Sequence, residues 1–130
     1  MPAGPSISPS LRYRDARAAI DFLRDAFGFE PVAVYDGDDG KIAHAELAYG
    51  DGMVMLGSAG RDDSGLGLDR TIGNTSVYVV VDDADAHHAR ALANGAAEVR
   101  ALVDQVYGSR EYSARDPEGN LWSFGTYRGE

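Results

Sequence analysis

Side chains that could carry out chemistry are few in this chain of 130 residues, and their spacing limits what they can do. His44 and Glu46 are one residue apart, so on an extended strand an imidazole and a carboxylate would lie side by side. Such a pair could act as a base with its orienting group, bind polar groups of a ligand or hold a metal ion. Alternatively, it could be a structural pair whose two groups hydrogen-bond only to each other. His87 and His88 are adjacent and match no metal-ligand spacing. We expect His88 to pack against a sheet and His87 to face solvent.

The composition excludes several classes of site. The chain has no cysteine, which rules out disulfides, cysteine–zinc sites, thiolate nucleophiles and iron–sulfur clusters. Its 12 Lys and Arg against 21 Asp and Glu give a formal net charge of −9, which argues against nucleic acid or an anionic membrane as a partner. No apolar run approaches the roughly 20 residues of a membrane span, and the first residues lack a signal-peptide pattern. These features predict a cytoplasmic protein.

The chain contains one pattern twice, 68 residues apart. Each copy begins with an alternating extended run that ends in an Asp, Ser8–Asp15 in the first half and Ser76–Asp83 in the second. A helical segment follows and ends at a glycine, Gly28 or Gly95, and an extended segment begins soon afterwards. Ordered matches at one spacing indicate a duplicated module.

Each copy is expected to contain one helix with recognisable ends. Asp15 and Asp83 are suitable N-caps, because a carboxylate accepts hydrogen bonds from the free amides of the first turn. Gly28 and Gly95 suit the left-handed position that follows a helix. The apolar spacing predicts buried faces formed by Ala16, Ala19, Ile20, Leu23 and Phe27 in the first helix and by Ala89, Leu92, Ala93 and Ala96 in the second.

The remaining segments alternate as strands do. The strands expected after the helices are Pro31–Tyr35, Lys41–Tyr49, Met53–Gly57, Glu98–Val103, Glu111–Arg115 and Asn120–Tyr127. The fold class is therefore predicted to be α+β, a single domain (1–130) of two βαβββ modules at about residues 6–57 and 74–127, with a linker at 58–73. The mixed sheets of two such modules can curve their open faces into a cup, where a ligand would bind.

Two segments give this pattern a family resemblance. The opening Leu11–Phe22 and the ending Asp116–Phe124 are similar to those of the vicinal oxygen chelate superfamily, which holds glyoxalases, bleomycin-resistance proteins and extradiol dioxygenases. The segment Tyr107–Tyr127 resembles a PhnB-like, glyoxalase-like subgroup in particular. The resemblance implies the cup-shaped fold and a homodimer, but not one activity, because the superfamily supports several chemistries.

The metal positions that this resemblance implies lack metal ligands in this chain. Metalloenzymes of the superfamily hold a divalent ion with His, Gln or Glu on the first and last strands of each module. The corresponding positions are Ser8, Met55, Ser76 and Ser123. Hydroxyl and thioether groups are weak or soft ligands for such an ion. We therefore expect no metal and no other cofactor at these positions.

Strand alternation selects the side chains that would line the cup. If Ser8 and Ser76 face it, so do Arg12 and Tyr78 on their respective strands, which would supply a cation and an aromatic ring. The alternatives are a structural ion pair for Arg12 and core packing for Tyr78. The candidate ligand-binding residues are Arg12, His44, Glu46, Met55, Ser76, Tyr78, Tyr107, Glu111 and Ser123.

Two functions of different classes fit these residues. The first is a metal-free protein of the bleomycin-resistance type that sequesters a partly aromatic or antibiotic-like small molecule in the cup. The second is a glyoxalase- or dioxygenase-like enzyme that uses a divalent metal at other ligands, such as His44 and Glu46, or metal-free acid–base residues. A small-molecule ligand is expected in both cases.

Overall fold

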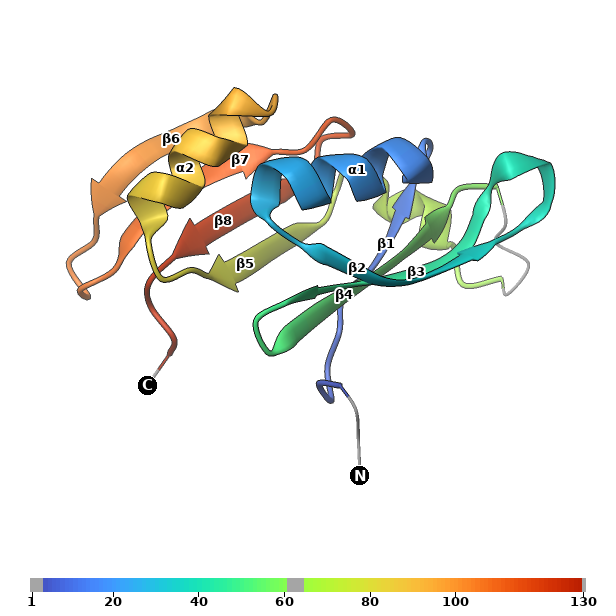
Figure 1. Cartoon of the computed structure of the whole chain (residues 1–130), viewed down its shortest axis with the longest axis horizontal. Coiled ribbons are helices and arrows are strands. Elements are labelled where there is room, and N and C mark those ends of the chain that lie inside the picture. Colours follow the sequence, from blue (N-terminus) through green and yellow to red (C-terminus); the bar gives the residue numbers. More distant parts are fainter. Residues whose placement is uncertain (1–3, 61–64, 130) are drawn as a thin grey trace.

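Two four-stranded sheets, each with one helix, make up the computed structural model of this chain (Figure 1). The structure describes residues 4–60 and 65–129. The elements are β1 (Ser10–Tyr13), α1 (Ala16–Phe27), β2 (Glu30–Asp36), η1 (Asp38–Gly40), β3 (Ile42–Tyr49), β4 (Gly52–Ser58), η2 (Leu68–Thr71), β5 (Ser76–Val80), α2 (Ala84–Ala93), β6 (Ala97–Asp104), β7 (Arg110–Arg115) and β8 (Leu121–Gly125). Among the described residues, no helix is long and apolar enough to cross a membrane.

The two sheets have the same topology, which confirms the predicted α+β fold of two βαβββ units. Their strand orders are β1-β4-β3-β2 and β5-β8-β7-β6, and the first pair in each order is parallel. Ser10 lies opposite Met55 in the first sheet, and Tyr78 lies opposite Ser123 in the second. Both members of the second pair follow their counterparts by 68 positions. Met55 and Ser123 thus occupy equivalent places in the two modules.

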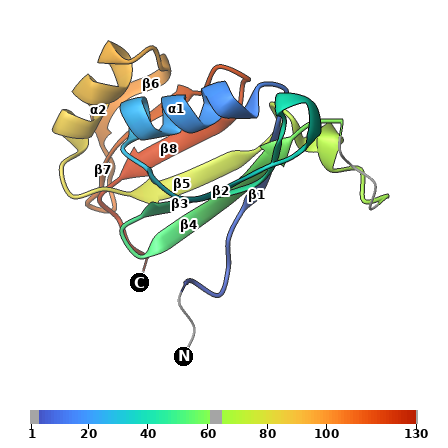
Figure 2. The ribbon, with the colours of Figure 1, turned by 45° about the vertical axis from the view of Figure 1, so that its right-hand side comes forward.

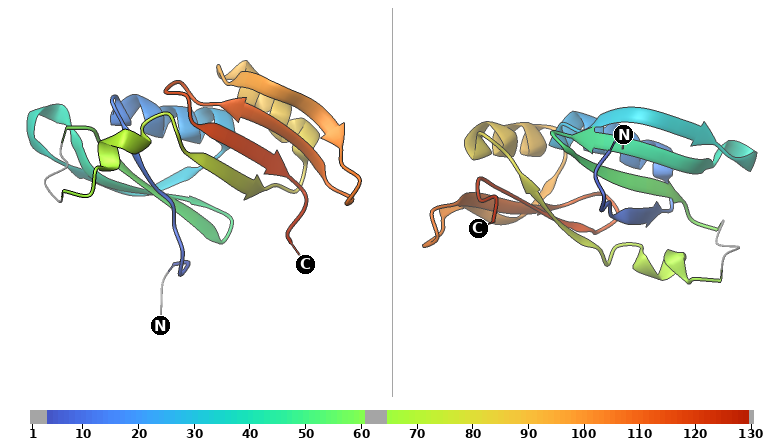
Figure 3. Two further views of the ribbon diagram at one scale, coloured as in Figure 1. Left: turned by 180° about the vertical axis from the view of Figure 1, so that it is seen from behind. Right: turned by 90° about the horizontal axis from the view of Figure 1, so that it is seen from below.

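Both helices lie on the same side of the molecule, next to each other (Figures 1 and 2). Seen from behind, the second sheet lies in front of α2, and none of the helices in residues 4–60 and 65–129 covers its outer face (Figure 3). One apolar core continues across the two modules. Phe27 at the end of α1 packs against Trp122 and Phe124 of β8, with ring centroids 5.6 and 4.7 Å apart. Trp122 is fully buried there, as its position in the strand predicts.

The helix ends form as the sequence predicts, and one of them depends on the other module. Asp15 accepts a hydrogen bond from the Ala18 amide, and Gly28 after α1 is left-handed with φ of 82°. The guanidinium of Arg90, on α2, donates to the carbonyl oxygens of Asp25 and Arg24 at 2.9 Å. A cation at this end of α1 meets the negative end of the helix dipole. The second helix thus caps the first.

The buried face of α2 differs from the prediction. The face that packs inward consists of Ala84, His87 and Ala91, whereas Leu92 is 39% exposed. The predicted stripe of Ala89, Leu92 and Ala93 is wrong, and so is the expectation that His87 faces solvent. The reason is that α2 packs against α1 as well as against its own sheet, which turns position 87 inward. His88 lies at the margin of this buried face and contacts Glu98.

His87 is buried where the two modules meet. Its Nε2–H donates to the carbonyl oxygen of Phe27 at 2.8 Å, which leaves Nδ1 as the acceptor for the Tyr112 hydroxyl at 2.5 Å. Both nitrogens are therefore satisfied in the neutral imidazole. Burial is the main cause that lowers the pKa of His87, and the nearby positive charge of Arg90 lowers it further.

Stability is expected to decrease in mild acid because of His87. The imidazole of the unfolded chain takes up a proton near pH 6.5, whereas the folded one stays neutral to lower pH. Its contribution is complete above about pH 6.5 and is lost as the pH falls towards the folded pKa. Urea denaturation measures the free energy of unfolding at pH 7.5 and at pH 5.5. The decrease in this free energy between the two pH values should be about 1 kcal/mol smaller in His87→Gln than in wild type. Equal pH dependence in wild type and variant would contradict this assignment.

The turn between β7 and β8 connects the two modules. Asp116 lies in this turn and is buried, and it accepts a hydrogen bond of 2.6 Å from the hydroxyl of Tyr13 on β1. It also accepts from the indole Nε1 of Trp122 and the side-chain amide of Asn120, both at 3.1 Å. Glu118 accepts from the backbone amides of residues 14 and 15 just before α1. One turn of the second module thus binds both ends of the β1–α1 connection.

Candidate functional site

A pocket of about 710 Å³ opens on the face of the second sheet that no helix covers. Each of the four strands contributes a side chain to it: Tyr78 from β5, Arg100 from β6, Glu111 from β7 and Ser123 from β8. These residues share a face because the register places Tyr78 opposite Ser123, and residues two apart on a strand point the same way. The pocket is therefore a direct product of the pairing within this sheet.

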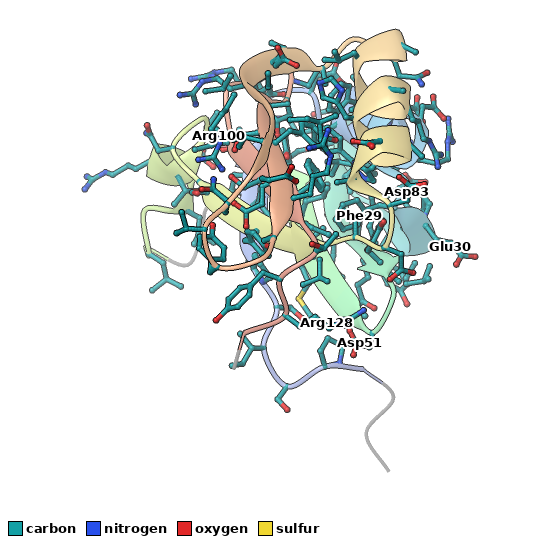
Figure 4. All side chains as sticks on the ribbon, turned by 90° about the vertical axis from the view of Figure 1, so that its left-hand side faces the viewer. Phe29, Glu30, Asp51, Asp83, Arg100 and Arg128 are labelled. Atoms are coloured by element: carbon teal, nitrogen blue, oxygen red, sulfur yellow. The ribbon has the colours of Figure 1, made fainter. Side chains whose placement is uncertain are left out.

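Aromatic rings and cations complete the walls of the pocket. Tyr107, in the loop before β7, packs edge-on against Tyr127 with ring centroids 5.3 Å apart. Tyr78 and Tyr107 are 43% and 52% exposed, so both rings are accessible to a ligand. Arg100 lies on β6, and Arg128 lies in the segment after β8 (Figure 4). Arg128 and Asp51 of the β3–β4 turn both line the adjoining groove. The pocket thus combines three phenol rings with two guanidinium groups.

The carboxylate of Glu111 lies at the floor of this pocket and is 3% exposed. The Tyr107 hydroxyl donates to its Oε1 at 2.8 Å, Arg100 donates to the same oxygen at 3.2 Å, and the Tyr78 hydroxyl donates to Oε2 at 3.2 Å. Burial by itself would raise the pKa of Glu111. Hydrogen bonds from Tyr107, Ser109 and Tyr78, together with the charge of Arg100, outweigh burial and lower the pKa below its ordinary 4.5. Glu111 is therefore ionised at neutral pH.

Space for this cluster depends on Gly125 of β8. Gly125 lies opposite Glu111 in the sheet. A β-carbon at this position would lie 2.5 Å from both the Glu111 Cγ and the Tyr78 hydroxyl oxygen. Side-chain atoms cannot approach that closely, so the Glu111–Tyr78 contact requires glycine at position 125.

The other predicted residues lie outside this pocket. In the first sheet, His44 Nε2 lies 2.9 Å from Glu46 Oε2, and the ring of Tyr35 stacks on His44 at 6.2 Å. Arg12 donates to the carbonyl oxygen of Ser58 at 3.1 Å. The structure thus brings together Tyr78, Tyr107, Glu111 and Ser123 and leaves the predicted residues Arg12, His44, Glu46, Met55 and Ser76 elsewhere.

A second groove of about 540 Å³ lies between the β3–β4 turn and β5. Ile7, Pro9 and Met53 give it an apolar wall. It shares Tyr78, Val80 and Arg128 with the pocket, so the two hollows adjoin along β5.

Sequence reasoning missed Arg100, Tyr127, Arg128 and Gly125. The pairing of β6 with β7 shifts register between Arg100 and Val103, so alternation along β6 could not predict which of its residues face the pocket. Tyr127 is the last residue of the expected strand Asn120–Tyr127, but β8 ends at Gly125, so Tyr127 and Arg128 lie in the segment after the strand. Gly125 had a usable signal, because an isolated glycine within a strand often marks a close approach.

The residues at the family's metal positions do not fit a divalent ion. The hydroxyl groups of Ser123 and Ser113 are paired with each other at 2.8 Å, and Met55 offers only a thioether. Across residues 4–60 and 65–129, no three His, Asp or Glu side chains come together as metal ligands would.

Comparisons with known proteins agree with this fold. The model of the Glyoxalase/Bleomycin resistance protein/Dioxygenase superfamily matches residues 7–124. Over 129 residues, the chain is 39% identical to the uncharacterized proteins Mb0911c of Mycobacterium bovis and Rv0887c of Mycobacterium tuberculosis. These alignments cover 93% of this chain and 82% and 74% of the respective relatives.

Solved structures show the same architecture. TioX from Micromonospora sp. ML1 is 35% identical with a TM-score of 0.81, over 96% of this chain and 100% of TioX. TnmS3, an antibiotic binding protein from Streptomyces sp. CB03234, shares the fold at 22% identity with a TM-score of 0.70, over 95% of this chain and 97% of TnmS3. The chain belongs to the glyoxalase/bleomycin resistance protein/dioxygenase superfamily.

Proposed function

We propose that this protein binds and sequesters a planar, partly aromatic or antibiotic-like small molecule without using a metal ion. The observation that carries the proposal is the pocket of about 710 Å³, with three tyrosine rings in its walls and an ionised Glu111 at its floor. Its size is in the usual range of small-molecule sites, which combine apolar walls with a few polar groups. Tyrosine rings offer large faces for stacking a flat ligand.

Two further points support binding over catalysis. TnmS3, which shares the fold, is described as an antibiotic binding protein. The residues at the family's metal positions are hydroxyl and thioether groups, which suit contact with a ligand better than coordination of a divalent ion. The ending Tyr107–Tyr127 is also the basis for proposing a PhnB-like subgroup.

We further propose a homodimer. The strand β6 is exposed along nearly its whole length, including Val99 and Val103, and on β2 both Val34 and Tyr35 are exposed. Exposed apolar strands at a sheet edge favour association with another chain. A second copy could place the open face of its first sheet, with His44 and Glu46, against the pocket. Sedimentation velocity tests this, because a monomer at micromolar concentration would refute it.

Ligand binding is expected to depend on Tyr78. Replacing it with alanine removes a stacking surface, and the affinity for a planar aromatic ligand should decrease about tenfold. Isothermal titration calorimetry suits this measurement, because Trp122 is buried away from the pocket and its fluorescence would not report contact with a ligand. Leu92→Ala, on the outer face of α2, is the control and should bind as wild type does. Equal affinity of Tyr78→Ala and wild type would contradict the proposed site.

The second candidate function is an enzyme whose reactive residues are His44 and Glu46. The 2.9 Å contact between them, with the Tyr35 ring stacked on His44, favours this alternative. Metal analysis of protein purified without chelator, together with a turnover assay on α-keto aldehydes and catechols, distinguishes the two functions. Stoichiometric metal with turnover that His44→Ala abolishes would replace the binding proposal with the enzyme.

A further inference from the structure

The hydroxyl of Tyr107 has a fixed direction as a hydrogen-bond donor. It donates to Oε1 of Glu111 at 2.8 Å. An ionised carboxylate only accepts hydrogen bonds, so the proton between these two oxygens must belong to the phenol. What Tyr107 presents to the pocket is therefore an oxygen lone pair.

Tyr78 has the same relation to Glu111 but more polar neighbours. Its hydroxyl donates to Oε2 at 3.2 Å, and Ser109 and the Tyr127 backbone lie close enough to Tyr78 to lower its pKa against the effect of burial. In the described part of the chain, no side chain donates to the oxygen of Tyr107, whose residue is 52% exposed. The open acceptor of the pocket is consequently Tyr107.

We propose that Glu111 orients the Tyr107 hydroxyl as a fixed acceptor, and that this selects aromatic ligands which carry a hydrogen-bond donor, such as an aryl amine, amide N–H or hydroxyl. This inference rests on the proposed binding function and names the ligand chemistry at the same pocket. Glu111 acts through Tyr107 rather than on the ligand directly, because its carboxylate is nearly buried and already accepts from Tyr107, Tyr78 and Arg100. It is a positioning residue.

The orientation is stable against a competing ligand. A hydrogen bond to an ionised acceptor is roughly twice as strong as one between neutral groups. A ligand carbonyl that competes for the Tyr107 proton would replace the stronger bond with a weaker one and leave a buried carboxylate with one donor fewer. A ligand donor meets no such obstacle, and the bond from Tyr107 to Glu111 polarises the phenol oxygen so that it accepts more strongly.

Three neutral probes of one ring system test this selection: 1-aminonaphthalene, 1-methylnaphthalene and 1-acetylnaphthalene. The amine carries a hydrogen-bond donor, the ketone carries only an acceptor, and the methyl compound carries neither. In wild type the amine should bind about tenfold more tightly than the methyl compound, and the ketone no more tightly than the methyl compound. In Tyr107→Phe the amine should lose this advantage, while the affinity for the methyl compound is retained.

Glu111→Gln tests the role of the carboxylate. A glutamine amide can donate to the phenol oxygen, so Tyr107 is free to turn its proton into the pocket. The ketone should then gain several-fold in affinity and the amine should lose a similar factor. Glu30→Gln removes one negative charge from an exposed position on β2 and should keep the wild-type order (Figure 4).

The outcomes separate this inference from the function on which it rests. If none of the three probes binds, the proposed function fails at this pocket and the inference fails with it. If the methyl compound binds and the amine binds no more tightly, the selection by Tyr107 is refuted while aromatic binding stands. If Tyr107→Phe keeps the preference for the amine, the acceptor is another group and the inference is refuted.

Discussion

Replacing Asp116 with alanine is expected to lower the free energy of unfolding by about 3–5 kcal/mol. The change removes the acceptor shared by three buried side-chain donors: the Tyr13 hydroxyl, the Trp122 indole and the Asn120 amide. The backbone amides of residues 118 and 120 also donate to this carboxylate. A buried donor without a partner costs about 1–3 kcal/mol, and the losses are only partly additive because the donors share one site.

Urea denaturation followed by far-ultraviolet circular dichroism measures this loss. Asp85→Ala is the matched control, since it removes an exposed carboxylate that pairs with Arg110 at the surface. Such surface pairs contribute at most about 1 kcal/mol. The free energy of unfolding of Asp116→Asn should lie between those of wild type and Asp116→Ala, because the amide keeps one accepting oxygen. A loss below 1 kcal/mol in Asp116→Ala, similar to that of the control, would show that the network is not a main source of stability.

Replacing Gly125 with alanine is expected to reduce ligand affinity more than tenfold and to lower stability by about 1–3 kcal/mol. The added methyl group would overlap with the Glu111 Cγ and the Tyr78 hydroxyl, both 2.5 Å away. Relief of this overlap requires the carboxylate and the phenol to move apart, which breaks the contact that sets the pocket floor. The backbone at Gly125 is not in the left-handed region, so the effect is steric and local.

Titration calorimetry with 1-aminonaphthalene and urea denaturation of the same preparations separate the two effects. Gly52→Ala on β4 is the control, because its methyl group would lie at an ordinary 3.4 Å from the Tyr49 carbonyl oxygen. Its stability should stay within about 1 kcal/mol of wild type. Undiminished binding by a folded Gly125→Ala protein would mean that the Glu111–Tyr78 contact does not shape the ligand site.

The repeat in the sequence was sufficient to predict the fold, because capping residues, glycines and strand alternation recur at one spacing in both halves. The family resemblance pointed to Glu111 and Ser123, and alternation along a regular strand identified Tyr78. It could not identify Arg100, where the register of β6 shifts, or the inward face of α2, which is set by packing against α1. Features that depend on contacts between elements produce no periodic pattern of residue types in the sequence, so they could not be predicted from it.

Much of what binds the modules together is reciprocal. Tyr13 of the first module supplies a donor to the buried Asp116 of the second, while Arg90 and His87 of the second supply donors to carbonyl oxygens at the end of α1. Each half therefore completes hydrogen bonds that the other half cannot satisfy alone. Although the halves share one architecture, we expect that neither folds as an autonomous unit. Equilibrium unfolding should accordingly be a single cooperative transition in which both sheets are lost together.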